Sequence, residues 1–216
     1  MLKYDVFFDE KEHLYLVDGV ACPSVTEILN PIHRSYGKIN QSVLEQAAER
    51  GRAVHEALEE IDLDLDPEID SDIEAYVQAY LDWKQIYDPD WEMIEQIVFC
   101  QEGWFIGTLD RMGKINGSPA IVDIKTSTPN REAYVSVCLQ TTAYAIAVAS
   151  ETNFDPNWQE YDRYGLFLMK DGKFRFLNCK EWEGQNHIEA AANFAALLKM
   201  NKRITKLLET KGRKSE

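Results

Sequence analysis

Apolar residues recur along this chain with helical spacing in some segments and with strand spacing in others. Helical spacing predicts helices from Asn40 to about Ile61, over roughly 70–87, from Arg131 to about Ala149, and over about 185–209. The first of these helices should direct an apolar stripe toward the core, and that stripe comprises Val43, Ala47, Val54, Leu58 and Ile61.

The segments with strand character are short and are bounded by turn residues. Near the N-terminus, strands over 6–8 and 14–17 precede a turn at Asp18-Gly19. Ser24 and Glu27 then have the spacing of a capping box, which predicts the start of a helix. Later strands are expected over 92–99, 103–115, 120–125, 164–169 and 174–177.

The strongest local signal is Asn116-Gly117, which lies between two β-rich runs and predicts a tight hairpin. Around this turn, residues face each other when their numbers sum to 233, as 116 and 117 do. Asp110 and Asp123 meet this condition, so we expect their side chains to lie directly opposite each other. Lys125 follows Asp123 by two residues and should therefore lie on the same face.

Two carboxylates held this close repel each other. A divalent cation between them removes the conflict, because hard cations such as Mg²⁺ prefer oxygen ligands. A lysine beside that cation would add a second positive charge, and the combination would suit hydrolysis of a phosphodiester. The Asp-x-Lys tripeptide alone is more typical of a solvated hairpin face with scattered charges. The register and the neighbouring motifs favour the metal site.

Five segments carry a family pattern: Pro23 to Leu29, Gly51 to His55, Gly107 to Asp110, Asp123 to Thr126, and Gln140 to Tyr144. In this order they resemble the PD-(D/E)XK nuclease superfamily, in its RecB-like exonuclease branch. The first segment is similar to the opening of phage exonucleases and of the mitochondrial genome-maintenance exonuclease. The resemblance extends from about residue 13 to about residue 200.

This resemblance implies an α/β fold with a restriction-endonuclease-like core. The core would be a mixed central sheet of four or five strands flanked by helices, with an N-terminal helical lobe. We expect a single nuclease domain over residues 1–216. Its N-terminal strands and helical lobe would occupy 1–90, the sheet and helix core 91–180, and a C-terminal helix with a basic tail 181–216.

The resemblance also implies roles for individual residues. The metal ligands would be His55, Asp110, Asp123 and the backbone carbonyl of Ile124. Asp110, Asp123, Lys125 and Gln140 would be catalytic, and Tyr144, Thr126 and Arg52 would bind the substrate.

Three of these assignments have simpler alternatives in the sequence. His55 could be a half-buried packing residue, and Gln140 and Tyr144 could be ordinary helix contacts. Glu95 and Glu102 precede Asp110; either could reach the site, although solvated strand positions suit both better.

The ion would be Mg²⁺ or Mn²⁺, because a histidine beside two carboxylates favours these ions. No iron–sulfur cluster is expected, since the four cysteines (Cys22, Cys100, Cys138 and Cys179) are scattered like small buried hydrophobes. No ATP site is expected, because the chain lacks a Gly-x-x-x-x-Gly-Lys motif.

The net charge of −14 argues against a protein that binds nucleic acid over its whole surface. The charge is uneven, however. Eleven Asp or Glu and no Lys or Arg lie between Arg52 and Lys84, whereas 199–214 holds seven Lys or Arg and only Glu209. The acidic stretch predicts a solvated region turned away from DNA. The basic tail could touch a phosphate backbone or be a frayed terminus.

These observations lead to a metal-dependent DNA exonuclease that works from a free end. By resemblance, the end would be single-stranded and the polarity 5′ to 3′; a strand-annealing recombinase would be a partner by analogy only. The alternatives are a structure-selective endonuclease and an inactive protein that binds DNA ends. With no signal-peptide pattern and no apolar run of 18 residues, we expect no membrane association and a cytoplasmic location, with a phage or bacterial origin.

Overall fold

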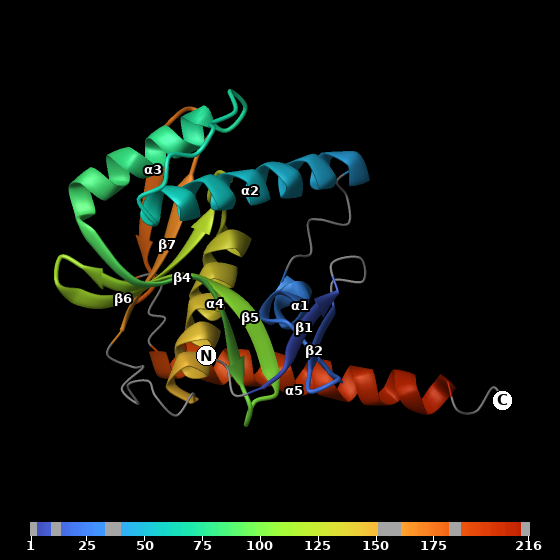
Figure 1. Ribbon diagram of the computed structural model, residues 1–216. Coiled ribbons are helices and arrows are strands. Elements are labelled where there is room, and N and C mark those ends of the chain that lie inside the picture. The colour runs from blue at the N-terminus through green and yellow to red at the C-terminus, as the bar shows by residue number, and fades with distance from the viewer. Residues whose placement is uncertain (1–3, 10–13, 33–39, 151–160, 182–186, 213–216) are drawn as a thin grey trace.

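The computed structural model describes residues 4–9, 14–32, 40–150, 161–181 and 187–212 (Figure 1). Its centre is a five-stranded sheet with the order β4-β5-β6-β7-β8. These strands are β4 (Pro89–Cys100), β5 (Phe105–Ile115), β6 (Ser118–Lys125), β7 (Asp162–Leu168) and β8 (Phe174–Asn178). β6 and β7 are parallel and the other neighbours are antiparallel, so the predicted mixed sheet is confirmed.

Helices cover both faces of this sheet (Figure 1). On one face, Ile121 of β6 packs in a core with α1 (Val25–Leu29), α4 (Arg131–Ser150) and α5 (His187–Gly212). On the other face, the neighbouring Val122 packs with α2 (Gln41–Asp62) and α3 (Glu74–Tyr87). Successive side chains of β6 therefore point to opposite faces of the sheet and pack in two separate hydrophobic cores, as expected for the α/β class.

A second sheet of three short strands packs against β4 and β5. It consists of β1 (Val6–Asp9), β2 (Leu14–Val17) and β3 (Val20–Cys22), and it leads through α1 into a 3₁₀ turn, η1 (Asn30–Ile32). The first two strands and the turn at Asp18-Gly19 were predicted, and both turn residues have positive φ. β3 was not predicted, because three residues are too few to show a period. The capping box of Ser24 and Glu27 is present.

α2 begins where the sequence predicts, with the Asn40 side chain accepting a hydrogen bond from the Ser42 backbone N–H. Only part of the predicted apolar stripe reaches the core. Val54 and Leu58 are fully buried, whereas Val43 is 53% exposed. The first half of α2 extends past the edge of the large sheet (Figure 1), so its apolar residues have no core to enter.

The β5–β6 hairpin has the predicted turn and register. Asn116 and Gly117 both have positive φ, which is the geometry of a type I′ turn. The pairs run from Ile115 with Ser118 to Arg111 with Val122, and each pair sums to 233. Pairing between these strands stops there, one position before Asp110 and Asp123.

α4 is the central helix of the first core. Its length and composition would also fit a membrane span, but most of the helix, including Val137, Thr141 and Ala145, is buried inside the protein. All four cysteines are buried free thiols, as the scattered spacing predicts.

Candidate active site

The β5–β6 hairpin opens at Asp110 and Asp123, and the Asp110 side chain fills the gap between the two strands. β6 leaves β5 after Val122 and continues beside β7, where Asp123 pairs with Gly165 and Lys125 with Phe167. The Asp110 Oδ2 atom accepts a hydrogen bond of 2.6 Å from the backbone N–H of Ile124. The two carboxylates are therefore neighbours where the strands diverge, rather than a pair within the ladder.

Asp123 is fully buried, and Lys125 is its ionic partner. The Lys125 Nζ atom lies 2.6 Å from Asp123 Oδ2, as expected for residues on one face of a strand. Asp123 Oδ1 has no hydrogen-bond partner among the residues that the structure describes. Burial raises the pKa of Asp123 to about 7, and the charge of Asp110 adds to this effect, although Lys125 opposes it.

His55 comes from α2 and is held on both of its ring nitrogens. Nδ1 lies 3.0 Å from Glu95 Oε1, and Nε2 lies 3.2 Å from the carbonyl oxygen of Ile124. Burial alone would lower the pKa of His55, but the negative charges of Asp110 and Glu95 raise it. The imidazole thus bridges β4 and the divergent end of β6.

Glu95 lies inside this cluster, whereas the sequence favoured a solvated strand position for it. It has a φ of 46°, which is unusual for a residue with a side chain. The β4–β5 register is unchanged on both sides, with Ile94 opposite Arg111 and Gln96 opposite Leu109. Glu95 therefore falls opposite Asp110 at a local interruption of the ladder. A backbone outlier beside a cluster of charged groups is a feature of functional sites.

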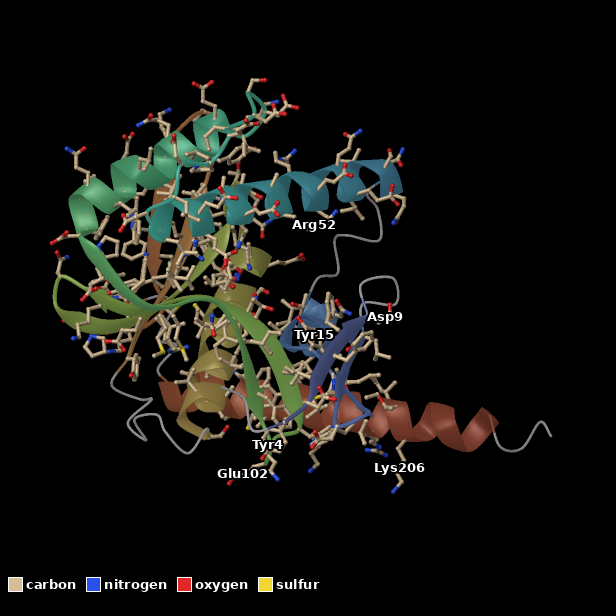
Figure 2. The ribbon with its side chains drawn as sticks, viewed as in Figure 1. Tyr4, Asp9, Tyr15, Arg52, Glu102 and Lys206 are labelled. Atoms are coloured by element: carbon tan, nitrogen blue, oxygen red, sulfur yellow. The ribbon has the colours of Figure 1, made fainter. Side chains whose placement is uncertain are left out.

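A register argument could have found Glu95. The four-residue turn over 101–104 makes facing residues of β4 and β5 sum to 205, as Cys100 and Phe105 do. That register places Glu95 opposite Asp110. Burial alone would raise the pKa of Glu95, but its hydrogen bond to His55 and the charges of His55 and Arg111 lower it. Glu102, by contrast, is exposed at the far end of the hairpin (Figure 2).

These donors fit a divalent cation. One ligand atom each from His55, Glu95 and Asp110 lie within 4.8 Å of one another. Asp123 adds a buried carboxylate with an oxygen that no described residue satisfies, and its pKa is raised first by burial and then by the charge of Asp110. Carboxylate oxygens with one imidazole are a donor set that suits Mg²⁺ or Mn²⁺.

Comparison with known families agrees with this geometry. The family model of the PD-(D/E)XK nuclease superfamily matches residues 68–210. The chain belongs to this superfamily. Membership indicates a metal-dependent nuclease that acts on DNA, on a fold that the five-stranded sheet bears out. The matched segment contains Asp110, Asp123 and Lys125, whereas His55 and Arg52 precede it. A comparison with curated proteins returns no match.

The Gln-x-x-x-Tyr pattern of this nuclease lies on α4, beneath the site. Gln140 Nε2 donates a hydrogen bond of 2.9 Å to Tyr144 Oη, and both side chains are buried. Burial and the nearby charges of Asp123 and Asp110 raise the pKa of Tyr144. The Tyr144 ring packs against Gly107: a Cβ added to Gly107 would lie 2.8 Å from Tyr144 Cε1. The glycine of the Gly-x-x-Asp pattern therefore makes room for the tyrosine of the later motif.

Of the two residues expected to bind the substrate beside Tyr144, Thr126 directly follows β6 and Arg52 lies on α2. Thr126 follows Lys125 and is half-buried, and α2 approaches it at Gly51, where an added Cβ would lie 3.6 Å from Thr126 Oγ1. Arg52 is exposed, and in the view of Figure 2 it lies on the side of α2 nearer to β1 and β2. The structure thus brings the middle of α2 close to the end of β6.

Proposed function

We propose that the protein is a metal-dependent exonuclease of the RecB-like branch, which shortens single-stranded DNA from a free end. The observation that carries the proposal is the convergence of Asp110, Asp123 and Lys125 where β5 and β6 diverge, with His55 of α2 above them. An inactive protein that binds DNA ends would gain nothing from buried, mutually repelling carboxylates.

Four groups would hold Mg²⁺ or Mn²⁺: the His55 imidazole, the Asp110 and Asp123 carboxylates, and the Ile124 carbonyl. His55 Nε2 and the Ile124 oxygen already point toward each other at 3.2 Å. The bound ion would supply an activated water and would neutralise charge on the phosphate. Glu95 would fix the orientation of the imidazole through Nδ1, as carboxylates commonly do behind metal-bound histidines.

Lys125 would act on the negative charge that develops on the scissile phosphate. The Lys125 side chain is one-third exposed while its partner Asp123 is buried, so the lysine would meet a substrate without leaving that carboxylate. Gln140 would orient the reacting groups from below. Tyr144, which the sequence assigned to the substrate, is buried and would instead hold Gln140 in place by accepting its hydrogen bond. Arg52 and Thr126 would contact the phosphate backbone.

Two observations support the proposal that the enzyme requires a free DNA end. The motif set resembles nucleases that process ends, and the charge of −14 is poorly suited to capturing internal sites through phosphate contacts. We propose 5′-to-3′ polarity from the resemblance to phage exonucleases. A role in phage recombination beside a strand-annealing protein, in the cytoplasm of a bacterial host, belongs to the same proposal and rests on that resemblance alone.

The test compares circular and linear forms of one single-stranded DNA, with Mg²⁺, Mn²⁺ or EDTA. We expect the linear form to shorten progressively to small products and the circle to survive. Blocking one end at a time would then give the polarity. Asp123→Asn protein serves as the control for a contaminating nuclease, and an RNA strand of the same sequence tests the sugar preference.

Each alternative function has its own outcome in this experiment. Rapid cutting of the circle would show an endonuclease, and the metal site would stand. Binding of linear DNA without any cleavage under either ion would show an end-binding protein and would remove the proposed chemistry.

A further inference from the structure

One acid in the acidic stretch is not solvated. Asp62 ends α2, and its side chain is fully buried. Its carboxylate accepts hydrogen bonds from Tyr80 Oη at 2.5 Å, from Lys84 Nζ at 2.6 Å and from Arg111 Nε at 2.7 Å. The end of α2 is thereby connected to α3 and to β5 through a single carboxylate.

Arg111 continues this connection into the active site. Its side chain is also fully buried, and its Nη1 donates to Glu95 Oε1 and to the backbone oxygen of Asp110, both at 2.8 Å. The same Glu95 oxygen lies 3.0 Å from His55 Nδ1. A continuous series of contacts therefore runs from Asp62 through Arg111 to Glu95 and His55, with a branch to the backbone of Asp110.

The contacts from Asp62 through Arg111 to Glu95 are suited to holding side chains in fixed positions. A guanidinium group is planar and rigid, so a carboxylate that holds Nε also sets the direction of Nη1. Replacing a buried ion pair with apolar groups is often neutral for stability, so stability alone is a weak reason for one here. By contrast, metal donors must be held within about 0.5 Å of their working positions.

We propose that Asp62 and Arg111 are positioning residues that hold Glu95, His55 and Asp110 in the arrangement that binds the metal. Asp62 lies in a different element from every proposed ligand except His55, and it touches none of them in the structure as described. The inference deepens the proposed function, because it concerns the ion on which that function depends.

The first measurement is Mn²⁺ affinity by calorimetry. Asp62→Asn should weaken binding roughly 10- to 100-fold, the usual effect of losing a group that orients a metal ligand. Asp82→Asn is the matched control, since Asp82 is an exposed acid of α3 that bonds to Gln78. Cleavage by Asp62→Asn should recover at high Mn²⁺ concentration, because the chemical groups remain in place.

Asp62→Asn leaves the buried Arg111 with Glu95 as its remaining ionic partner, so this variant could unfold. The double variant Asp62→Asn with Arg111→Met removes both charges and guards against this. It should remain folded yet bind Mn²⁺ as weakly as the single variant. Loss of the folded state in both variants would overturn the proposal, because the pair would then serve the fold.

A second measurement needs no metal. The chain has four histidines, so the nitrogen NMR signals of His55 can be assigned with a His55→Ala sample. Asp62→Asn should shift the Nδ1 signal of His55 in metal-free protein, and Asp82→Asn should not. If wild-type protein failed to bind Mn²⁺, the proposed function would fall while this shift still supported positioning. Folded variants with unchanged affinity and an unchanged signal would overturn positioning alone.

Discussion

Asp123 combines two properties that usually exclude each other, full burial and a negative charge. Its neighbours only partly compensate for the burial, since Lys125 is attractive and Asp110 is repulsive. The folded pKa of about 7 is above the ordinary value of 3.8, so we expect the metal-free protein to lose stability as the pH rises from about 4 to about 7. A metal ligand in this state is costly for the apo fold, and binding of the ion would relieve the cost.

Asp123→Asn should therefore stabilise the metal-free protein while weakening its affinity for Mn²⁺. We expect a gain on the order of 2 kcal/mol in the free energy of unfolding above pH 7, because a buried negative charge is removed. The gain should shrink as the pH falls toward 4. Chemical denaturation in EDTA at several pH values measures it, with exposed Asp82→Asn as the control. Mn²⁺ binding equal to wild type would contradict the ligand assignment.

Lys125→Ala should separate binding from chemistry. The ammonium group is proposed to act on charge that appears only in the transition state, so its removal lowers turnover without a matching loss of ground-state affinity. We expect single-turnover cleavage to fall by a factor on the order of 10² to 10³. Mn²⁺ and DNA affinities should change little. Wild-type turnover would show that the lysine serves only to pair with Asp123.

At the scale of elements, the two motif glycines differ in whether their surroundings leave room for a side chain. At Gly107, an added Cβ would lie 2.8 Å from the buried Tyr144 ring and 3.3 Å from Val25 Cγ2, so β5 and α4 would have to move apart. At Gly51, the nearest atom would be Thr126 Oγ1 at 3.6 Å, which is an ordinary contact.

Gly107→Ala should destabilise the protein by about 1–3 kcal/mol, the usual cost of overpacking a core. Gly51→Ala is the matched change within a helix and should stabilise by about 0.5–1 kcal/mol, because alanine is the better helix former. Thermal unfolding of both variants checks the pair. Equal melting temperatures would show that the Gly107–Tyr144 contact is looser than the structure has it.

Much of this element arrangement follows from local sequence signals. The turn at Asn116-Gly117 and its register need only the two turn residues and the strand period, and both are confirmed. The capped start of α2 at Asn40 is equally local. The exposure of Val43 could not be predicted, because helical periodicity shows which side of a helix is apolar but not how far the sheet extends beneath it.

The arrangement of the candidate site was predictable only where its residues share a hairpin or a family motif. Asp110, Asp123 and Lys125 lie on two strands joined by one turn, so counting along the chain relates them. The contact between Asp62 and Arg111 joins residues 49 positions apart, on elements whose packing no local pattern encodes. Asp62 therefore looked like one more solvated acid within an acidic run.

On the scale of the whole molecule, the two signs of charge are segregated. The acidic run lies on α2, α3 and their connector, whereas 199–214 brings seven Lys or Arg to α5 and the residues that follow it. α5 extends beyond the sheets on the same side as β1 and β2 (Figure 1). Lys202, Arg203 and Lys206 are exposed on this extension, in a segment that is helical rather than frayed.

We expect this part of α5 to contact the DNA backbone. Replacing Lys202, Arg203 and Lys206 with alanine should weaken single-stranded DNA binding. It should also reduce the slope of log affinity against log salt by up to about 2, since each lost phosphate contact contributes about 0.7. The matched control replaces three other exposed cations with alanine. These are Lys114 of β5 and, in the turn between β7 and β8, Lys170 and Lys173. Equal slopes for the two triple variants would exclude α5 from the interface.

The proposed ligands come from two parts of the chain, since α2 supplies His55 and the β5–β6 hairpin supplies Asp110 and Asp123. An ion bound by both α2 and the β5–β6 hairpin would hold these two elements together, in addition to its role in the reaction. At a hundredfold excess over its dissociation constant it would stabilise the folded state by about 2.7 kcal/mol. A protease added to the EDTA-treated enzyme should therefore cut within α2 sooner than in the presence of Mn²⁺. In a cell short of the ion, this enzyme would be lost to degradation as well as to inactivity.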